Sequence, residues 1–149
     1  YYKPQIQKKN LLVKFEKREP LPDIMLDLSK MRIAFENIID NAIRYTLPGG
    51  KIRILTTKGE EEIEIKIQDT GVGIPENQKD KVFEKFFRGE NIIKMETEGT
   101  GLGLFISKYI IEAHGGKIWL ESEEKKGTTF YITLPIKEKF GEYLNPEFY

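Results

Sequence analysis

The chain has 149 residues, 39% of them hydrophobic, which is enough for one domain with an apolar core and too few for two. Its 24 basic and 24 acidic residues cancel, so the overall charge does not favour binding to nucleic acid or to an anionic membrane surface. The absence of cysteine excludes disulfides and thiolate metal sites, and no apolar run approaches the roughly 20 residues of a membrane span. We therefore expect a cytoplasmic domain without direct membrane contact, although its parent protein could be membrane-anchored.

The first third of the chain predicts a linker, two strands and one long helix. Residues 1–10 show no clear periodicity and are interpreted as a linker or the end of a preceding helix, whereas residues 11–16 and 24–26 predict strands. From Ser29, the expected N-cap, apolar residues recur at helical spacing up to the Pro48-Gly49-Gly50 sequence. These residues, which should face a sheet, are Met31, Ala34, Phe35, Ile38, Ile39 and Ala42.

The remaining elements alternate between strands and helices. Residues 51–57 and 62–69 predict an antiparallel hairpin, and after Pro75 a short helix is expected to carry Val82, Phe83, Phe86 and Phe87. A polar loop at 88–98 precedes a second amphipathic helix with an apolar stripe of Leu102, Phe105, Ile106, Tyr109, Ile110 and Ala113. Strands at 117–121 and 128–134 follow, and residues 137–149 form a charged and aromatic tail. This order predicts an α/β two-layer sandwich with a mixed sheet.

Asp69 is the first candidate site residue. Residues 62–68 alternate strictly in polarity, so Ile63, Ile65 and Ile67 share one face of a strand and Asp69 falls on the same inward face. A buried carboxylate is costly unless it is hydrogen-bonded, and the glycines that follow allow another surface to approach the backbone. A binding site is one interpretation. The alternative is a carboxylate that only caps the following turn.

A polar stripe runs beside the apolar stripe of the long helix. Asn37, Asn41, Arg44 and Tyr45 stand at i, i+4, i+7 and i+8, and therefore line one edge of that helix. An amide oxygen can ligate Mg²⁺, and arginine pairs with phosphate, so the stripe suits a nucleotide. The alternative is an ordinary solvated face.

Residues Gly99 to Leu104 open the second amphipathic helix, where free N–H groups and the helix dipole favour an anion. The segment lacks the lysine of a Walker A loop, and its spacing of GxGxG differs from the dinucleotide-binding GxGxxG. It predicts either a phosphate-binding loop of another kind or a flexible connection.

The single histidine and the large aromatic residues favour structural roles. His114 lies near a helix C-terminus beside two glycines, which favours a helix cap over a metal ligand or catalyst. Trp119 and the phenylalanines at 83, 86 and 87 are expected in the core and in helix packing. No metal-ligand cluster is evident, and nucleic acid is not an expected partner.

Four motifs together resemble the conserved boxes of sensor histidine kinases. The segments 37–46, 69–74, 81–88 and 99–104 resemble the N box, first glycine box, F box and second glycine box, in the same order and with similar spacing. Residues 127–135 also look like the last strands of that family. The resemblance covers roughly residues 3–136 and is to the catalytic ATP-binding domain.

The resemblance implies the Bergerat fold shared with gyrase-type ATPases and heat-shock chaperones, a mixed sheet of about five strands packed on three helices. It implies that Asp69 accepts a hydrogen bond from the adenine amino group and that Tyr45 flanks the base, while Gly71 and Gly73 give the base room. Ile74 and Thr128 would belong to the same ATP site.

On the phosphate side, the resemblance implies that Asn41 ligates Mg²⁺ and that Asn37 and Arg44 approach the phosphates. Residues 89–98 would cover the nucleotide as a lid. Arg88 would reach the γ-phosphate, so that Asn37, Arg44 and Arg88 act on the transferred group. The residues of the lid hinge and helix start that would contact ATP are Gly99, Thr100, Gly101, Leu102, Gly103 and Leu104.

The implied activity is transfer of the γ-phosphoryl group to a histidine. Related ATPases place a general-base glutamate where this chain has Asn37, and an amide cannot accept the proton of water. The acceptor histidine would lie on a helical dimerisation domain absent from this chain, in a homodimer that then phosphorylates a response regulator. Residues 1–10 would be the linker from that domain, residues 11–136 the catalytic domain and residues 137–149 a C-terminal tail.

Two alternative functions remain open. One is a serine protein kinase of the anti-sigma-factor type, which has the same fold. The other is a nucleotide-sensing interaction module without transfer activity.

Overall fold

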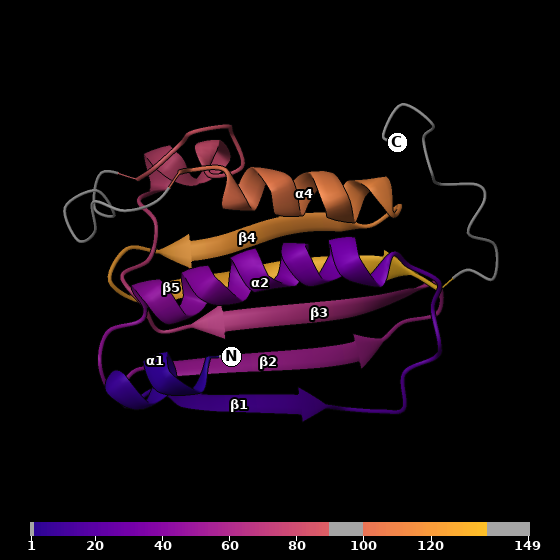
Figure 1. The fold of residues 1–149 in the computed structure, drawn as a ribbon, viewed down its shortest axis with the longest axis horizontal. Coiled ribbons are helices and arrows are strands. Elements are labelled where there is room, and N and C mark those ends of the chain that lie inside the picture. Colours follow the sequence, from indigo (N-terminus) through magenta and orange to yellow (C-terminus); the bar gives the residue numbers. More distant parts are fainter. Residues whose placement is uncertain (1, 90–99, 137–149) are drawn as a thin grey trace.

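The computed structural model describes residues 2–89 and 100–136. Its centre is a five-stranded sheet of order β1-β2-β3-β5-β4 (Figure 1). The strands are β1 (Leu12–Lys17), β2 (Lys51–Lys58), β3 (Glu62–Asp69), β4 (Lys117–Glu123) and β5 (Gly127–Pro135). The β1–β2 pair is parallel and the other pairs are antiparallel, so the predicted mixed α/β sandwich is confirmed.

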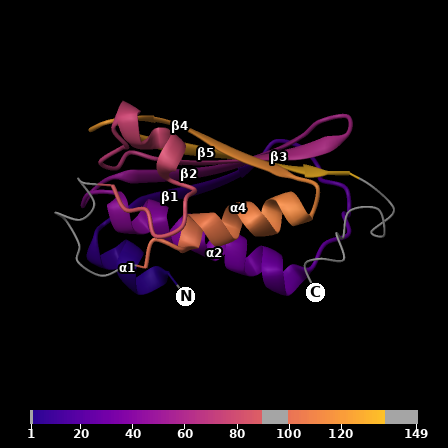
Figure 2. The same cartoon turned by 90° about the horizontal axis from the view of Figure 1, so that it is seen from above.

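Helices cover one face of the sheet, as Figure 2 shows. The helices are α1 (Lys3–Lys8), α2 (Leu28–Tyr45) and α4 (Gly103–Ala113), and a 3₁₀ helix, η1 (Glu76–Lys81), follows β3. Helices α2 and α4 pack side by side. Their contact includes the buried Ser107 hydroxyl, which donates to the Ala34 carbonyl over 2.9 Å.

Helix α2 follows the predicted apolar stripe but starts two residues earlier than expected. The N-cap is Asp27, whose Oδ1 accepts a hydrogen bond of 3.0 Å from the Lys30 N–H, so the prediction of Ser29 as N-cap is wrong. This backbone hydrogen bond lowers the pKa of Asp27. A carboxylate at this position binds the free N–H groups more strongly than a hydroxyl does. The buried residues are Met31, Ala34, Ile38, Ala42 and Ile43.

The inward face of the sheet is formed by the predicted alternation of β3. Ile63, Ile65 and Ile67 are buried, and their partners across the β3–β5 ladder are Leu134, Ile132 and Phe130. The next pair along the same face is Asp69 and Thr128. The alternation therefore leads from the hydrophobic core directly to a buried carboxylate.

Two predictions about local structure are wrong. Residues 24–26 form no strand, and Ile24 and Leu26 are partly buried against the core instead. The helix expected after Pro75 is the 3₁₀ helix η1, which ends at Lys81, before all four apolar residues that it was expected to carry. Phe86 among them has φ of 62° and is 70% exposed. Val82 is buried as expected, and Phe83 makes an edge-to-face contact with Phe130.

Trp119 was expected in the core but lies on the sheet face opposite the helices. Along β4 it is out of phase with the buried Ile118, and its ring stacks on Tyr131 at a centroid distance of 5.3 Å. Its side chain is 40% exposed. The sheet therefore carries an aromatic pair on its open side.

The N-terminal segment is attached to the end of α2. Lys9 Nζ donates to the carbonyls of Ile43, Arg44 and Thr46, over 3.0, 2.5 and 3.1 Å. The Lys9 carbonyl accepts from the Gly49 N–H over 2.8 Å. The interpretation of residues 1–10 as an interdomain linker stays a prediction, and the tail at 137–149 lies outside the described residues.

Candidate functional site

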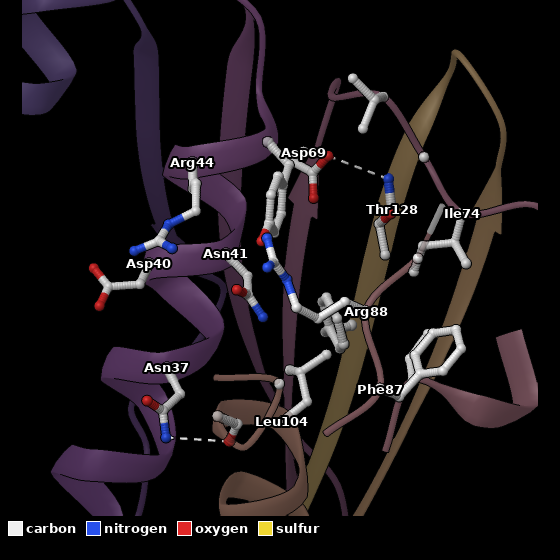
Figure 3. Close-up of a pocket in the computed structure, with 18 of the residues that line it drawn as sticks. Asn37, Asp40, Asn41, Arg44, Asp69, Ile74, Phe87, Arg88, Leu104 and Thr128 are labelled. Atoms are coloured by element: carbon white, nitrogen blue, oxygen red, sulfur yellow. Dashed lines mark hydrogen bonds between the residues drawn. The ribbon is translucent and has the colours of Figure 1, made fainter. Parts of the chain in front are cut away.

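A cavity of about 370 Å³ opens between the second half of α2, the connection after β3, the start of α4 and β5 (Figure 3). It brings together residues from all four conserved boxes and from β5. The predicted site residues in its wall are Asn37, Asn41, Arg44, Tyr45, Asp69, Gly73, Ile74, Arg88, Thr100, Gly101, Gly103, Leu104 and Thr128.

Asp69 faces inward at the end of β3, with 7% of its surface exposed. Its Oδ1 accepts hydrogen bonds from the Gly71 N–H over 2.8 Å and from the Thr128 N–H over 3.3 Å. Burial raises the pKa of Asp69 to about 6, although these two hydrogen bonds oppose the rise. Within the described part of the chain Oδ2 receives no hydrogen bond, so the turn interpretation accounts for only one oxygen of this carboxylate.

Helix α2 supplies the polar wall of the cavity. Asn37, Asn41, Arg44 and Tyr45 all line it, as their helical spacing predicts. Asn37 is held in place because its Nδ2 donates to the Gly103 carbonyl over 3.1 Å, which joins α2 to the start of α4. In Figure 3 the Asn41 side chain projects into the cavity from the next turn of α2. Two amides and a guanidinium thus lie on one side of the cavity.

The start of α4 lies beside this wall, next to Asn37, and no side chain caps its N-terminus in the described structure. Its first N–H groups and the positive end of its dipole therefore lie at the cavity, where they favour an anion. Gly101 has φ of +69°, and its carbonyl accepts from the Phe86 N–H over 3.0 Å. This contact fixes the position of the F box beside α4.

Two glycines of the first glycine box serve the packing of the chain itself. A Cβ on Gly71 would lie 2.5 Å from the Tyr45 carbonyl oxygen, and Gly71 does not line the cavity. Gly73 has φ of +68°, and a Cβ there would lie 2.0 Å from the Glu123 carbonyl oxygen. The space that Gly71 was expected to leave for a base is therefore occupied by the protein backbone.

Comparison with known proteins matches residues 26–138 to the family described as "Histidine kinase-, DNA gyrase B-, and HSP90-like ATPase". The chain belongs to this family. Sensor histidine kinase WalK of Bacillus subtilis is 42% identical over 125 residues, which cover 80% of this chain and 20% of WalK. The adaptive-response sensory kinase SasA of Synechocystis is 35% identical over 136 residues, 91% of this chain and 35% of SasA. The chain thus spans about a fifth to a third of the length of these curated relatives.

Solved structures of this ATPase family place the chain with histidine kinase catalytic domains. The catalytic domain of histidine kinase ThkA superposes with a TM-score of 0.78 at 32% identity, covering 91% of this chain and 86% of that domain. A longer ThkA, solved in complex with the response regulator protein TrrA, matches with a TM-score of 0.74 at 30% identity over 91% of this chain and 37% of ThkA. The resemblance drawn from the four boxes is confirmed.

Some members of the predicted site lie elsewhere. Leu102 does not line the cavity, and Gly99 and most of the predicted lid lie outside the described residues. The cavity wall includes Gly89 of the predicted lid and five residues to which the sequence gave no site role: Asp40, Val72, Val82, Phe87 and Phe130. Phe130 could have been predicted from the sequence, because it stands two residues after Thr128 and therefore shares the inward face of β5 with it. Asp40 and Val72 lie beside predicted site residues in the chain, whereas Val82 and Phe87 are brought to the cavity by tertiary packing.

His114 has the structural role that the sequence favoured. Its Nδ1 lies 2.7 Å from the Ile110 carbonyl, and its Nε2 accepts from the Asp27 N–H over 3.1 Å. These two contacts require the proton on Nδ1 and join the C-terminus of α4 to the start of α2. His114 does not line the cavity.

Residues 2–89 and 100–136 contain no group of three or more histidine, cysteine, aspartate or glutamate side chains arranged for a metal ion. In the same ranges no helix is long and apolar enough to cross a membrane.

Proposed function

We propose that this domain binds Mg-ATP and transfers the γ-phosphoryl group to a histidine on a helical dimerisation domain of the same protein. The single observation that carries the proposal is the composition of one cavity. Its β3–β5 side offers hydrogen-bond acceptors in Asp69 and Thr128, and its α2 side offers the amides and cations of Asn37, Asn41 and Arg44. The first side suits a base and the second suits phosphates.

The base would lie against Asp69. Asp69 Oδ2, which accepts from none of the described residues, can accept from the exocyclic amino group of adenine, and this charge-assisted hydrogen bond disfavours a base with a carbonyl there. Tyr45, Ile74 and Val72 supply apolar and aromatic walls beside it. Adenine recognition is therefore assigned to Asp69.

The phosphates would extend towards α2 and the N-terminus of α4. Arg44 and Arg88 both line the cavity and can pair with phosphate oxygens. Asn41 offers an amide oxygen to Mg²⁺, which usually takes one or two protein ligands and completes its shell with water and phosphate oxygens. That preference fits a wall in which the half-buried amide of Asn41 faces the cavity and the described residues form no cluster of carboxylates. Bound Mg²⁺ would neutralise charge on the β- and γ-phosphates.

Asn37 favours phosphoryl transfer to another group over hydrolysis. Its amide nitrogen is occupied by the Gly103 carbonyl, and an amide has no basicity near neutral pH, so Asn37 cannot activate water. In the proposed reaction a histidine nitrogen attacks the γ-phosphorus in line, the bond to the β,γ-bridging oxygen breaks, and ADP leaves. The unprotonated imidazole nitrogen attacks with its own lone pair, and the proton of the other ring nitrogen then passes to solvent, so this chain supplies positioning and charge.

The proposed context is a two-component system. The acceptor histidine would lie in a dimerisation domain joined to this one through residues 1–10. The full protein would be a cytoplasmic or membrane-anchored homodimer, and a response regulator would receive the phosphoryl group. The relatives WalK and SasA, both named as sensor kinases, and the ThkA complex with a response regulator support this context.

The test is phosphotransfer from γ-labelled ATP. The chain is mixed with Mg²⁺, labelled ATP and a histidine-bearing helical hairpin from its own parent protein, and with the same hairpin carrying alanine at that histidine. We expect acid-labile label on the first hairpin alone, and much less when the chain carries Asp69→Asn.

Bound nucleotide without label would overturn the kinase proposal and leave a sensing module. Acid-stable label on serine of a separate protein would favour the anti-sigma-factor type of kinase. Lack of nucleotide binding would overturn the whole proposal.

A further inference from the structure

Ser122 does not line the cavity, but its hydroxyl makes hydrogen bonds with two residues that do. On β4 it faces Thr128 across the β4–β5 ladder, and the two hydroxyl oxygens are 2.8 Å apart. Ser122 Oγ also accepts from the Ile74 N–H over 2.9 Å and donates to the Gly127 carbonyl over 2.8 Å. Both Ile74 and Thr128 line the cavity.

These contacts determine the direction of the hydrogen bond between the two hydroxyls. Ser122 has one proton, and the Gly127 carbonyl can only accept, so that proton lies between Ser122 and Gly127. The Ile74 N–H uses one lone pair of Ser122 Oγ. The other lone pair must then accept the proton of Thr128, because the opposite assignment leaves two oxygens 2.8 Å apart without a proton.

Thr128 is thereby limited to accepting from a ligand. Its proton is held by Ser122, and its remaining lone pairs are left for the cavity that Thr128 lines. Its cross-strand neighbour Asp69 also has an oxygen that only accepts when ionised. Two adjacent acceptors favour a donor such as an amino group or a bridging water, and disfavour a carbonyl.

We propose that Ser122 is a positioning residue for base selection, which orients the Thr128 hydroxyl so that this end of the cavity accepts only purines carrying an exocyclic amino donor. The proposal rests on the nucleotide site proposed above and adds a residue to it. Without the Ser122 hydroxyl, Thr128 can turn its proton towards the ligand and donate to a carbonyl. Ser122 therefore acts on selectivity through Thr128.

The experiment compares ADP with inosine diphosphate, whose base has a carbonyl oxygen in place of the amino group of adenine. Affinities of both are measured by titration calorimetry for the unmodified chain and for Ser122→Ala, with the exposed Ser29→Ala as the matched control. We expect Ser122→Ala to lower the ratio of ADP to inosine diphosphate affinity about five- to tenfold, and Ser29→Ala to leave it unchanged.

The ratio of ADP to inosine diphosphate affinity, measured within one variant, separates an effect on base selection from a loss of folded protein. Partial unfolding of Ser122→Ala lowers both affinities equally and leaves their ratio unchanged. Thr128→Val removes the hydroxyl itself, so Ser122→Ala added to Thr128→Val should leave the ratio of Thr128→Val unchanged.

The role of Ser122 would be overturned, with nucleotide binding intact, if Ser122→Ala left the affinity ratio unchanged. It would also be overturned if adding Ser122→Ala to Thr128→Val lowered the ratio as much as Ser122→Ala does alone. Failure of the unmodified chain to bind ADP would instead overturn the nucleotide site.

Discussion

Asp69 and Thr128 lie opposite each other in the β3–β5 ladder, and the Thr128 N–H donates to Asp69 Oδ1 over 3.3 Å. Even with this bond and the one from Gly71, burial raises the pKa of Asp69 from 3.8 to about 6. The folded chain therefore holds the Asp69 proton at pH values where the unfolded chain has released it. Ionisation of Asp69 consequently lowers the free energy of unfolding as the pH rises from about 4 to about 6.

Asp69→Asn is accordingly expected to stabilise the nucleotide-free chain while weakening nucleotide binding. An amide oxygen can still accept from Gly71 and Thr128, and the cost of burying a charge disappears, so the free energy of unfolding at pH 7.5 should rise by roughly 1 to 3 kcal/mol. The gain should vanish near pH 3.5, where both chains are uncharged at this position. ATP affinity at pH 7.5 should fall about ten- to hundredfold. Urea unfolding at the two pH values and calorimetric titration check these results, and a variant less stable at pH 7.5 would contradict the burial argument.

The ATP affinity of the unmodified chain should itself depend on pH. Protonation of Asp69 below about pH 6 removes the charge from its hydrogen bond to the amino group, so affinity should decline as the pH falls through 6. Titration between pH 5 and pH 8 measures this decline, and Asp69→Asn should show a much flatter profile. An equal decline in both chains would assign the pH dependence to another group.

Asn37 should contribute to stability through its bond to Gly103. Asn37→Ala removes the donor and should lower the free energy of unfolding by about 1 kcal/mol. Asn37→Asp should cost more, roughly 1 to 3 kcal/mol, because a carboxylate oxygen would then face the Gly103 carbonyl oxygen. Urea unfolding without nucleotide measures both effects, and equal stability of Asn37→Asp and the unmodified chain would mean that the bond does not hold α2 to α4.

Asn41 is the matched control one turn further along α2 and has no hydrogen bond from its side chain in the described structure. Asn41→Ala should therefore leave the free energy of unfolding nearly unchanged. If Asn41 ligates Mg²⁺, the variant should weaken ATP binding mainly when Mg²⁺ is present. Titrations with Mg²⁺ and with a chelator test this, and the same loss under both conditions would show that the amide contacts the nucleotide directly.

Gly73 and Gly103 should respond differently to alanine. At Gly73 both the positive φ and a Cβ 2.0 Å from the Glu123 carbonyl oxygen oppose a side chain, so Gly73→Ala should cost more than about 2 kcal/mol. At Gly103 the nearest atoms, those of the Asn37 side chain, lie 3.5 Å away, and stability should change by less than about 1 kcal/mol. Thermal unfolding ranks the two variants. A tolerated Gly73→Ala would mean that the loop after β3 can move away from Glu123.

Lys9 should stabilise the chain by capping α2. Its ammonium group donates to three carbonyls at the negative end of the helix dipole, and Lys9→Met should lower the free energy of unfolding by about 1 to 2 kcal/mol. Lys8→Met, an exposed neighbour with the same substitution, is the control and should have little effect. If the two variants lose the same stability in urea, the contribution comes from general charge and not from the cap.

The strict alternation of β3 and the helical stripe of α2 allowed the sheet face, the inward Asp69 and the polar stripe from Asn37 to Tyr45 to be predicted from sequence. These patterns are local, and each repeats several times along one element. The same alternation was available in β4. Trp119 stands out of phase with Ile118 and Leu120, and Ser122 stands in phase with them, so their faces could have been assigned.

Other features depend on contacts between distant segments. Phe86 is held outside the core because its N–H donates a hydrogen bond to the carbonyl of Gly101, which lies fifteen residues later in the chain. Asp27 caps α2 in preference to Ser29, and its own N–H bonds to His114 at the far end of α4. Gly71 is needed because the Tyr45 carbonyl occupies the space of a side chain. None of these pairings leaves a periodic pattern in the sequence.

Trp119 is the only tryptophan, and it stacks on Tyr131 on the face of the sheet opposite α2 and α4. Its fluorescence should therefore report the loss of the β4–β5 pairing on unfolding, while remaining insensitive to a ligand in the cavity on the helical side. The chain thus contains an intrinsic optical probe whose signal separates folding from binding without any label.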